Sequence, residues 1–119
     1  QTAMPQYIFV YLGGEMPPSP EEGKAHFEKY QRWLMSLGDA VVSPAVPFKD
    51  THTVRPDGSA AAGTTTAISG LSIIQAGSMP EALEVAKSCP FLEIHGTLEV
   101  SEMIEMSDTA ARPTNENLN

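Results

Sequence analysis

The sequence predicts a single α+β domain in which an antiparallel sheet carries two helices on one face. A chain of 119 residues is long enough for one ordinary domain and too short for two. Hydrophobic residues make up 41% of the chain and charged residues 18%, a balance typical of globular proteins. Segments with the composition of strands alternate with two segments that have helix start signals and helical spacing.

The first strand is predicted at residues 7–12, which are β-branched or aromatic with one leucine and end at Gly13 and Gly14. Successive side chains of a strand point to opposite faces, and here both faces are apolar. A strand of this kind needs cover on both sides, so we expect it at the centre of the sheet.

The first helix is predicted to begin after Ser19, because Ser19 can cap it, Pro20 suits the first helical position and Glu22 completes a capping box. The residues expected on its inner face are Phe27, Tyr30, Trp33, Leu34 and Leu37. Gly38 is expected to end this helix in a left-handed conformation.

The middle of the chain is predicted to add two strands. Residues 40–43 are predicted to form a short strand. Pro44 and Pro47 then either interrupt this strand or restrict it to an edge of the sheet. Residues 48–55 alternate and are also predicted to form a strand, followed by a turn at residues 56–58. Residues 59–66 are rich in alanine, glycine and threonine, so we expect a mobile loop there.

The second half repeats the pattern of the first. Residues 70–76 are predicted to form a strand, and Ser78 with Glu81 begins a second helix that ends before Pro90. Residues 97–106 form the last predicted strand, and the composition becomes polar from residue 107 onward. We therefore expect one domain over residues 1–106 and a polar tail over residues 107–119.

The predicted order, β-α-β-β-β-α-β, is close to the ferredoxin-like split βαβ arrangement with an inserted hairpin. Both helices then cover one face of the antiparallel sheet. The other face is expected to carry apolar side chains from residues 7–12, 71–76 and 98–106. An exposed apolar face of this size is unfavourable in a monomer, so we expect a homodimer with two-fold symmetry.

Short motifs along the chain also show a resemblance to a known family. They are YIFVYLGGE at 7–15, WLMSLGD at 33–39, THTV at 51–54, PDGS at 56–59, SGLSII at 69–74, ALEVAKSCP at 82–90, GTLEV at 96–100 and IEM at 104–106. In order and spacing they resemble the YCII-related domain family, which is related to the DGPF-domain group. The resemblance covers nearly all of residues 7–106 and implies a dimeric α+β barrel, without an established function.

The resemblance also shows where this chain departs from the family. Some relatives carry a histidine and an aspartate that are proposed as an active-site pair, and the matching positions here look like Tyr30 and Cys89. This implies that such an acid–base pair does not operate in this protein. A related subgroup carries an Asp-Gly-Pro-Phe loop and is seen near sigma-factor genes. The matching residues 60–67 lack that loop, so a sigma-factor partnership is not expected.

The net charge of −8 disfavours binding to nucleic acids and to anionic membrane surfaces, and no basic stripe offsets it. Cys89 is the only cysteine, which excludes an intramolecular disulfide and a cysteine-based zinc site. A single cysteine is compatible with a reducing cytoplasm, which is the expected location. No apolar run approaches the ~20 residues that span a bilayer. We expect no cofactor.

The candidate ligand-binding residues are Tyr11, Tyr30, His52, Cys89 and His95. The first four are expected around a cleft between the first helix and the sheet, and His95 lies in the turn before the last strand. The cleft is expected to be mainly apolar with a few polar groups, as small-molecule sites usually are. The three histidines are scattered without the spacing of a metal site, so no metal ligands are assigned.

Three functions remain open from the sequence. The first is a dimer with little or no catalytic activity that binds a small organic ligand in this cleft. The second is a small enzyme without metal or cofactor that uses His52 or Tyr30 for proton transfer. The third is a regulatory or structural partner protein, with the polar tail or the loop at residues 60–66 as its contact.

Overall fold

The computed structural model describes residues 4–104. The strands are β1 (Gln6–Gly13), β2 (Val41–Pro47), β3 (His52–Val54), β4 (Ala60–Ala62), β5 (Ile68–Gln75) and β6 (Gly96–Glu102). The helices are α1 (Pro20–Leu37) and α2 (Met79–Lys87), and two short 3-10 helices are η1 (Gly38–Ala40) and η2 (Pro90–Ile94). The α+β class expected from the sequence is confirmed.

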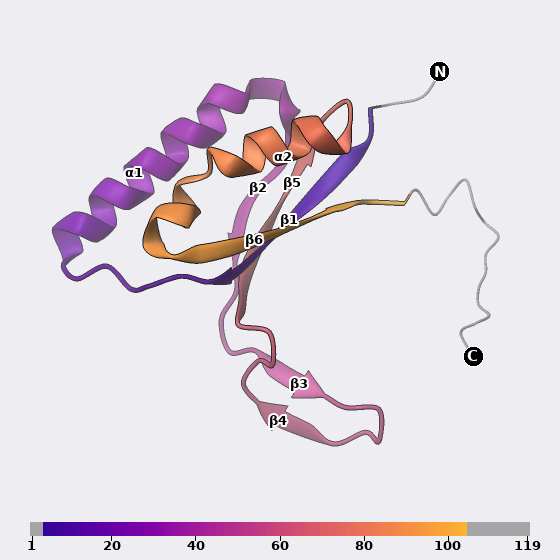
Figure 1. Ribbon diagram of the computed structural model, residues 1–119. Helices are drawn as coiled ribbons and strands as arrows, with labels where there is room; N and C mark the ends of the chain where they lie inside the picture. The colour runs from indigo at the N-terminus through magenta and orange to yellow at the C-terminus, as the bar shows by residue number, and fades with distance from the viewer. Residues whose placement is uncertain (1–3, 105–119) are drawn as a thin grey trace.

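Four strands form the main sheet in the order β2-β5-β1-β6, and each neighbouring pair is antiparallel. Strand β1 is central, as its two apolar faces predicted, and β2 lies at an edge, where its prolines are tolerated. Both helices lie on the same side of this sheet (Figure 1).

The core lies between the sheet and the two helices. Alternate residues of β1, namely Tyr7, Phe9 and Tyr11, are buried beneath the helices, whereas the residues between them are only half-buried. Trp33 of α1 and Ala82 and Ala86 of α2 belong to the same buried cluster. The indole Nε1 of Trp33 donates a hydrogen bond to Ser88 Oγ at 2.8 Å, which ties α1 to the end of α2.

The helix ends follow from local sequence. Ser19 Oγ accepts a hydrogen bond from the Glu22 backbone N–H at 3.1 Å, and Ser78 Oγ accepts one from Glu81 at 3.3 Å. Gly38 ends α1 with a φ of +57°, a conformation that glycine adopts more readily than other residues. Both predicted helix starts and the predicted end of α1 are therefore confirmed.

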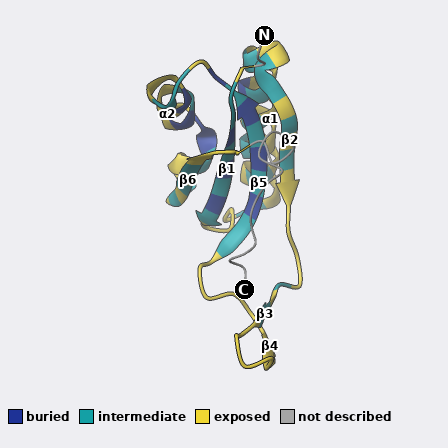
Figure 2. Cartoon of the chain, turned by 90° about the vertical axis from the view of Figure 1, so that its right-hand side faces the viewer, coloured by how far each residue is buried: buried dark blue, intermediate teal, exposed yellow. Residues whose placement is uncertain are grey.

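Among residues 4–104, no helix lies over the other face of the main sheet, and Figure 2 views the molecule from that side. Its half-buried apolar residues are Ile8, Val10 and Leu12 of β1 and Leu71 and Ile73 of β5. The expectation that the last strand adds apolar side chains here is wrong. Strand β6 presents Thr97, Glu99 and Ser101 on this face, because Leu98 and Val100 pack against the core on the other side.

The segment between β2 and β5 differs most from expectation. Instead of one strand over residues 48–55, β3 spans only His52–Val54 and pairs with β4, which lies in the expected loop. The two strands form an arm, residues 48–67, that projects beyond the main sheet (Figure 1). Asp50 and Ala67 adopt positive φ angles of 60° and 62° near its two ends, so regular extended backbone stops there.

The last strand also ends earlier than predicted, at Glu102 instead of residue 106. Residues 105 and 106 and the predicted tail at 107–119 lie outside the described residues. Within residues 4–104, no helix is both long enough and apolar enough to cross a membrane.

Candidate functional site

A cleft of about 380 Å³ lies between α1 and the end of the sheet where β1 finishes and β5 begins. Its lining comes from β1, α1, β2, β5 and η2. The lining residues are Tyr11, Gly23, His26, Phe27, Tyr30, Ala45, Val46, Pro47, Ser69, Gly70, Phe91 and Ile94. The set is mostly apolar and contains no aspartate, glutamate, lysine or arginine, which favours an uncharged occupant.

One wall of the cleft is the ring of Phe91, which is seated against two glycines. A Cβ added at Gly96 would lie 2.1 Å from the Phe91 ring, and one added at Gly14 would lie 2.8 Å from it. The ring centroid also lies 5.1 Å from that of Tyr11, at an interplanar angle of 51°. The absence of side chains at these two positions therefore fixes where the Phe91 ring can lie.

The polar end of the cleft is a chain of three hydroxyl groups. Tyr30 donates a hydrogen bond to the hydroxyl oxygen of Tyr11, and the Tyr11 hydroxyl is hydrogen-bonded to Ser72 Oγ. Ser72 is fully buried and Tyr11 is 5% exposed, whereas Tyr30 is only partly buried and lines the cleft. The chain thus leads from the core to the cleft surface.

Burial controls the protonation of these groups. Loss of solvent raises the pKa of Tyr30 far above its ordinary value, and the hydrogen bond to Tyr11 raises it further. Loss of solvent also raises the pKa of Tyr11, although its hydrogen bonds with Ser72 and Tyr30 oppose the shift. Both phenols are therefore neutral at pH 7, and neither is suited to act as a general base.

Cys89, placed in the cleft by the sequence prediction, lies beneath it instead. It is 2% exposed, lies beside Tyr11 and does not line the cleft. Burial raises the pKa of its thiol to about 11, so the thiolate is scarce at neutral pH.

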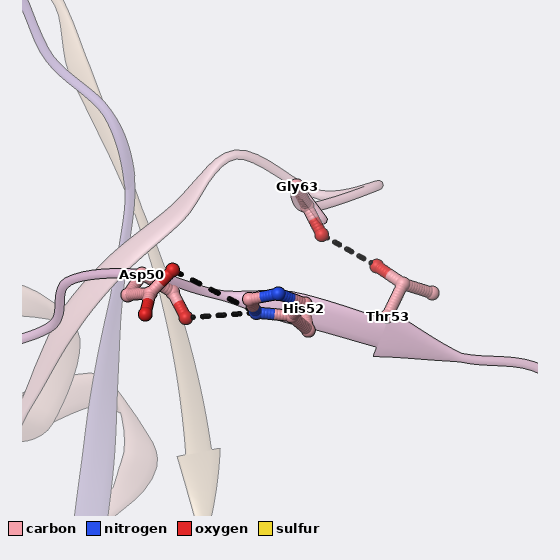
Figure 3. A network of polar contacts seen from close by, with 4 residues as sticks. All are labelled: Asp50, His52, Thr53 and Gly63. Atoms are coloured by element: carbon pink, nitrogen blue, oxygen red, sulfur yellow. Dashed lines mark hydrogen bonds and ion pairs between the residues drawn. The ribbon is translucent and has the colours of Figure 1, made fainter. Parts of the chain in front are cut away.

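The two candidate histidines lie outside the cleft lining. His52 is on the arm, where its Nδ1 lies 3.1 Å from the Asp50 backbone oxygen and 3.8 Å from Asp50 Oδ1. Figure 3 shows this pair beside the hydrogen bond from Thr53 Oγ1 to the Gly63 oxygen. His95 ends η2, and its Nδ1 lies 3.1 Å from Glu15 Oε1. The structure therefore brings Tyr11 and Tyr30 together without either histidine.

Several lining residues were not singled out by sequence reasoning. Phe27 was assigned to the inner face of the first helix but is 59% exposed at the cleft, and the half-buried His26 also lines the cleft. Phe91 follows the proline that ends the second predicted helix, and no local pattern marks it as a cleft wall. The only available signal was the pair of glycines, Gly14 and Gly96, on which its ring lies.

No group of three histidine, cysteine, aspartate or glutamate side chains suited to a metal ion occurs within residues 4–104. Comparison of the chain with protein-family models found no match, and comparison with curated proteins found none either.

Proposed function

We propose that this protein is a small homodimer that binds a small organic ligand in the cleft between α1 and the sheet. The observation that carries the proposal is the cleft itself. It is walled by Tyr11, Phe27 and Phe91, and its polar side chains include Tyr30, whose hydroxyl is partly buried. A concave apolar site with few polar groups is the usual form of a small-molecule site.

The cleft supports binding better than catalysis by His52 or Tyr30. His52 lies on the arm and not in the cleft lining, so it does not share a site with Tyr30 within one chain. The raised pKa of Tyr30 makes its phenolate rare at neutral pH. The titratable side chains of the lining are Tyr11, Tyr30 and His26, and no carboxylate, lysine or arginine lies among them, so the cleft holds no carboxylate pair to divide acid and base roles.

The proposal is tested by a thermal-shift screen of uncharged organic fragments. A ligand at 100 times its Kd stabilises the protein by about 2.7 kcal/mol through mass action. Ala45→Phe should fill the cleft and abolish the shift, whereas Ala61→Phe, an exposed position on the arm, should preserve it. If Ala45→Phe does not fold, Phe27→Ala at the exposed part of the lining takes its place. Shifts that survive both cleft substitutions would place the ligand elsewhere.

We also propose that the fold is a ferredoxin-like split βαβ arrangement that pairs into a dimeric α+β barrel, and that the chain is a YCII-related protein. The order β2-β5-β1-β6, with both helices on one face, supports this topology. The second copy is the proposed cover for the uncovered sheet face. On that face the two central strands, β1 and β5, carry no charged residue, and the edge strand β6 contributes Glu99.

The size of the uncovered face suits this partner. Strands of seven or eight residues, taken at ~3.3 Å per residue and ~4.8 Å between strands, give a face of roughly 500 Å². Two such faces bury about 1,000 Å², which reaches the lower limit for a specific interface. Pairing also removes Ile8, Val10 and Ile73 from water, which the hydrophobic effect favours.

The dimer is tested by light scattering at micromolar concentration. Ile73→Lys places a charge on the face between Ile8 and Ser43 and should yield monomers, whereas Val54→Lys changes an exposed valine of the arm and should leave the dimer intact. A stable wild-type monomer at these concentrations would reject the proposed pairing. It would leave the cleft untouched, because the cleft lies on the helix side of the sheet.

A further inference from the structure

The direction of hydrogen bonding at the polar end of the cleft defines what a ligand meets there. A tyrosine hydroxyl has one proton to donate and lone pairs to accept with. Tyr30 donates its proton to Tyr11, and the Tyr11 hydroxyl is bonded in turn to Ser72. The proton of Tyr30 is therefore directed toward the buried Tyr11, so toward the cleft that Tyr30 lines its hydroxyl oxygen can only accept.

The lining has two other polar side chains. Ser69 Oγ donates to the Tyr11 backbone oxygen at 3.2 Å, so its proton is also engaged and its oxygen, like that of Tyr30, is left to accept. His26 lies on α1 one turn before Tyr30, with the two ring centroids 6.5 Å apart. No lining residue carries a permanent charge to compensate a charged ligand. An anion or a cation would therefore lose its hydration without gaining a counter-charge.

The shape of the cleft favours a flat ring system. The ring centroids of Phe91 and Tyr30 lie 5.1 and 6.1 Å from that of Tyr11, which are spacings of aromatic packing. Gly14 and Gly96 hold the Phe91 ring in place, so this wall is formed before a ligand arrives. A volume of about 380 Å³ is near the lower end for ligand pockets and suits one or two fused rings.

We propose that the cleft selects an uncharged aromatic compound that carries a hydrogen-bond donor, such as a phenol, and that this donor binds the oxygen of Tyr30. The proposal deepens the proposed ligand-binding function and rests on it. The aromatic body packs between Phe91 and α1, and the donor satisfies the one acceptor that the hydroxyl chain leaves at the cleft surface. Selectivity then arises from the direction of the chain and from the absence of charge.

Calorimetric titration at pH 7 with four related probes tests this inference. The probes are 2-naphthol, which donates, 2-methoxynaphthalene, which only accepts, naphthalene, which does neither, and 2-naphthoate, which is charged. We expect 2-naphthol to bind about five- to tenfold more tightly than naphthalene or 2-methoxynaphthalene, as one net hydrogen bond of ~1 kcal/mol implies. Binding of 2-naphthoate should be weaker than that of naphthalene.

Matched tyrosine variants connect the preference to one residue. Tyr30→Phe should bind naphthalene as the wild type does but lose the preference for 2-naphthol. Tyr7→Phe removes a hydroxyl from a buried tyrosine that does not line the cleft, so the preference should persist.

Two kinds of failure are distinguishable. If 2-methoxynaphthalene or 2-naphthoate binds as tightly as 2-naphthol, the inferred selectivity is overturned while ligand binding stands. The same holds if Tyr30→Phe keeps the preference. If none of the four probes binds, and the fragment screen with the cleft variants also finds no ligand, the ligand-binding function fails and this inference fails with it.

Discussion

Substitution of Gly96 by alanine tests the packing that forms the cleft wall. The added Cβ would lie 2.1, 2.3 and 2.7 Å from three carbons of the Phe91 ring, whereas ordinary contact begins near 3.4 Å. The ring must therefore move by more than 1 Å. Gly14 and Tyr11 lie against the same ring, so the displacement is not free.

The expected cost follows from two opposing terms. Overpacking of a well-packed site costs about 1–3 kcal/mol, and the reduced entropy of the unfolded chain returns about 0.4–1 kcal/mol for glycine to alanine. Because Gly96 lies outside the left-handed region, alanine adds no backbone strain there. The free energy of unfolding should fall by about 1–2 kcal/mol.

Urea denaturation followed by fluorescence measures this change, because Trp33 is the only tryptophan and is buried in the core. Phe91→Leu should relieve the clash, so Gly96→Ala and Phe91→Leu should be non-additive, with a coupling of at least 0.5 kcal/mol in a double-mutant cycle. Gly96→Ala with wild-type stability, or additive effects of the two substitutions, would show that the ring does not depend on Gly96.

Three further predictions concern ionisation, capping and surface charge. Burial raises the pKa of Cys89 to about 11, so the thiol of the unfolded chain ionises at a lower pH than the thiol of the folded protein. The stability that the neutral buried thiol contributes should therefore be complete below pH ~9 and be lost as the pH rises toward 11. Denaturation at pH 8 and pH 11 should show that the wild type loses about 2 kcal/mol more than Cys89→Ala; equal losses would exclude this role. Ser19→Ala should lower the unfolding free energy by about 1 kcal/mol through loss of the α1 cap, which a urea midpoint measures, and no change would mean that solvent replaces the cap. Lys29→Met should change stability by less than ~1 kcal/mol although Lys29 lies 2.6 Å from Glu93, because both side chains are exposed; a larger loss by the same assay would contradict this view.

The candidate site was only partly predictable. Tyr11 and Tyr30 were assigned to a cleft between the first helix and the sheet, and both line the cleft that the structure shows there. His52 was assigned from the alternation of residues 48–55, which assumed that the segment joins the main sheet. It pairs instead with β4 in the arm, because Asp50 turns the chain away first.

The sequence by itself determined the features that depend on a few neighbouring residues. The caps at Ser19 and Ser78, the stop at Gly38 and the alternation of β1 follow from local hydrogen bonding, backbone freedom and strand periodicity. These rules act over one to four residues, so they are readable along the chain and fix the α+β class.

Only the tertiary structure decided which distant segments meet. The register Tyr11↔Gly70 in one ladder and Tyr11↔Leu98 in the other brings Ser72 to the Tyr11 hydroxyl and turns β6 so that Glu99 faces away from the helices. The position of the Phe91 ring likewise depends on contacts with the loop after β1 and with the first residue of β6, which are far apart in the sequence. A one-residue slip in either ladder would reverse these faces, and local composition does not encode the register.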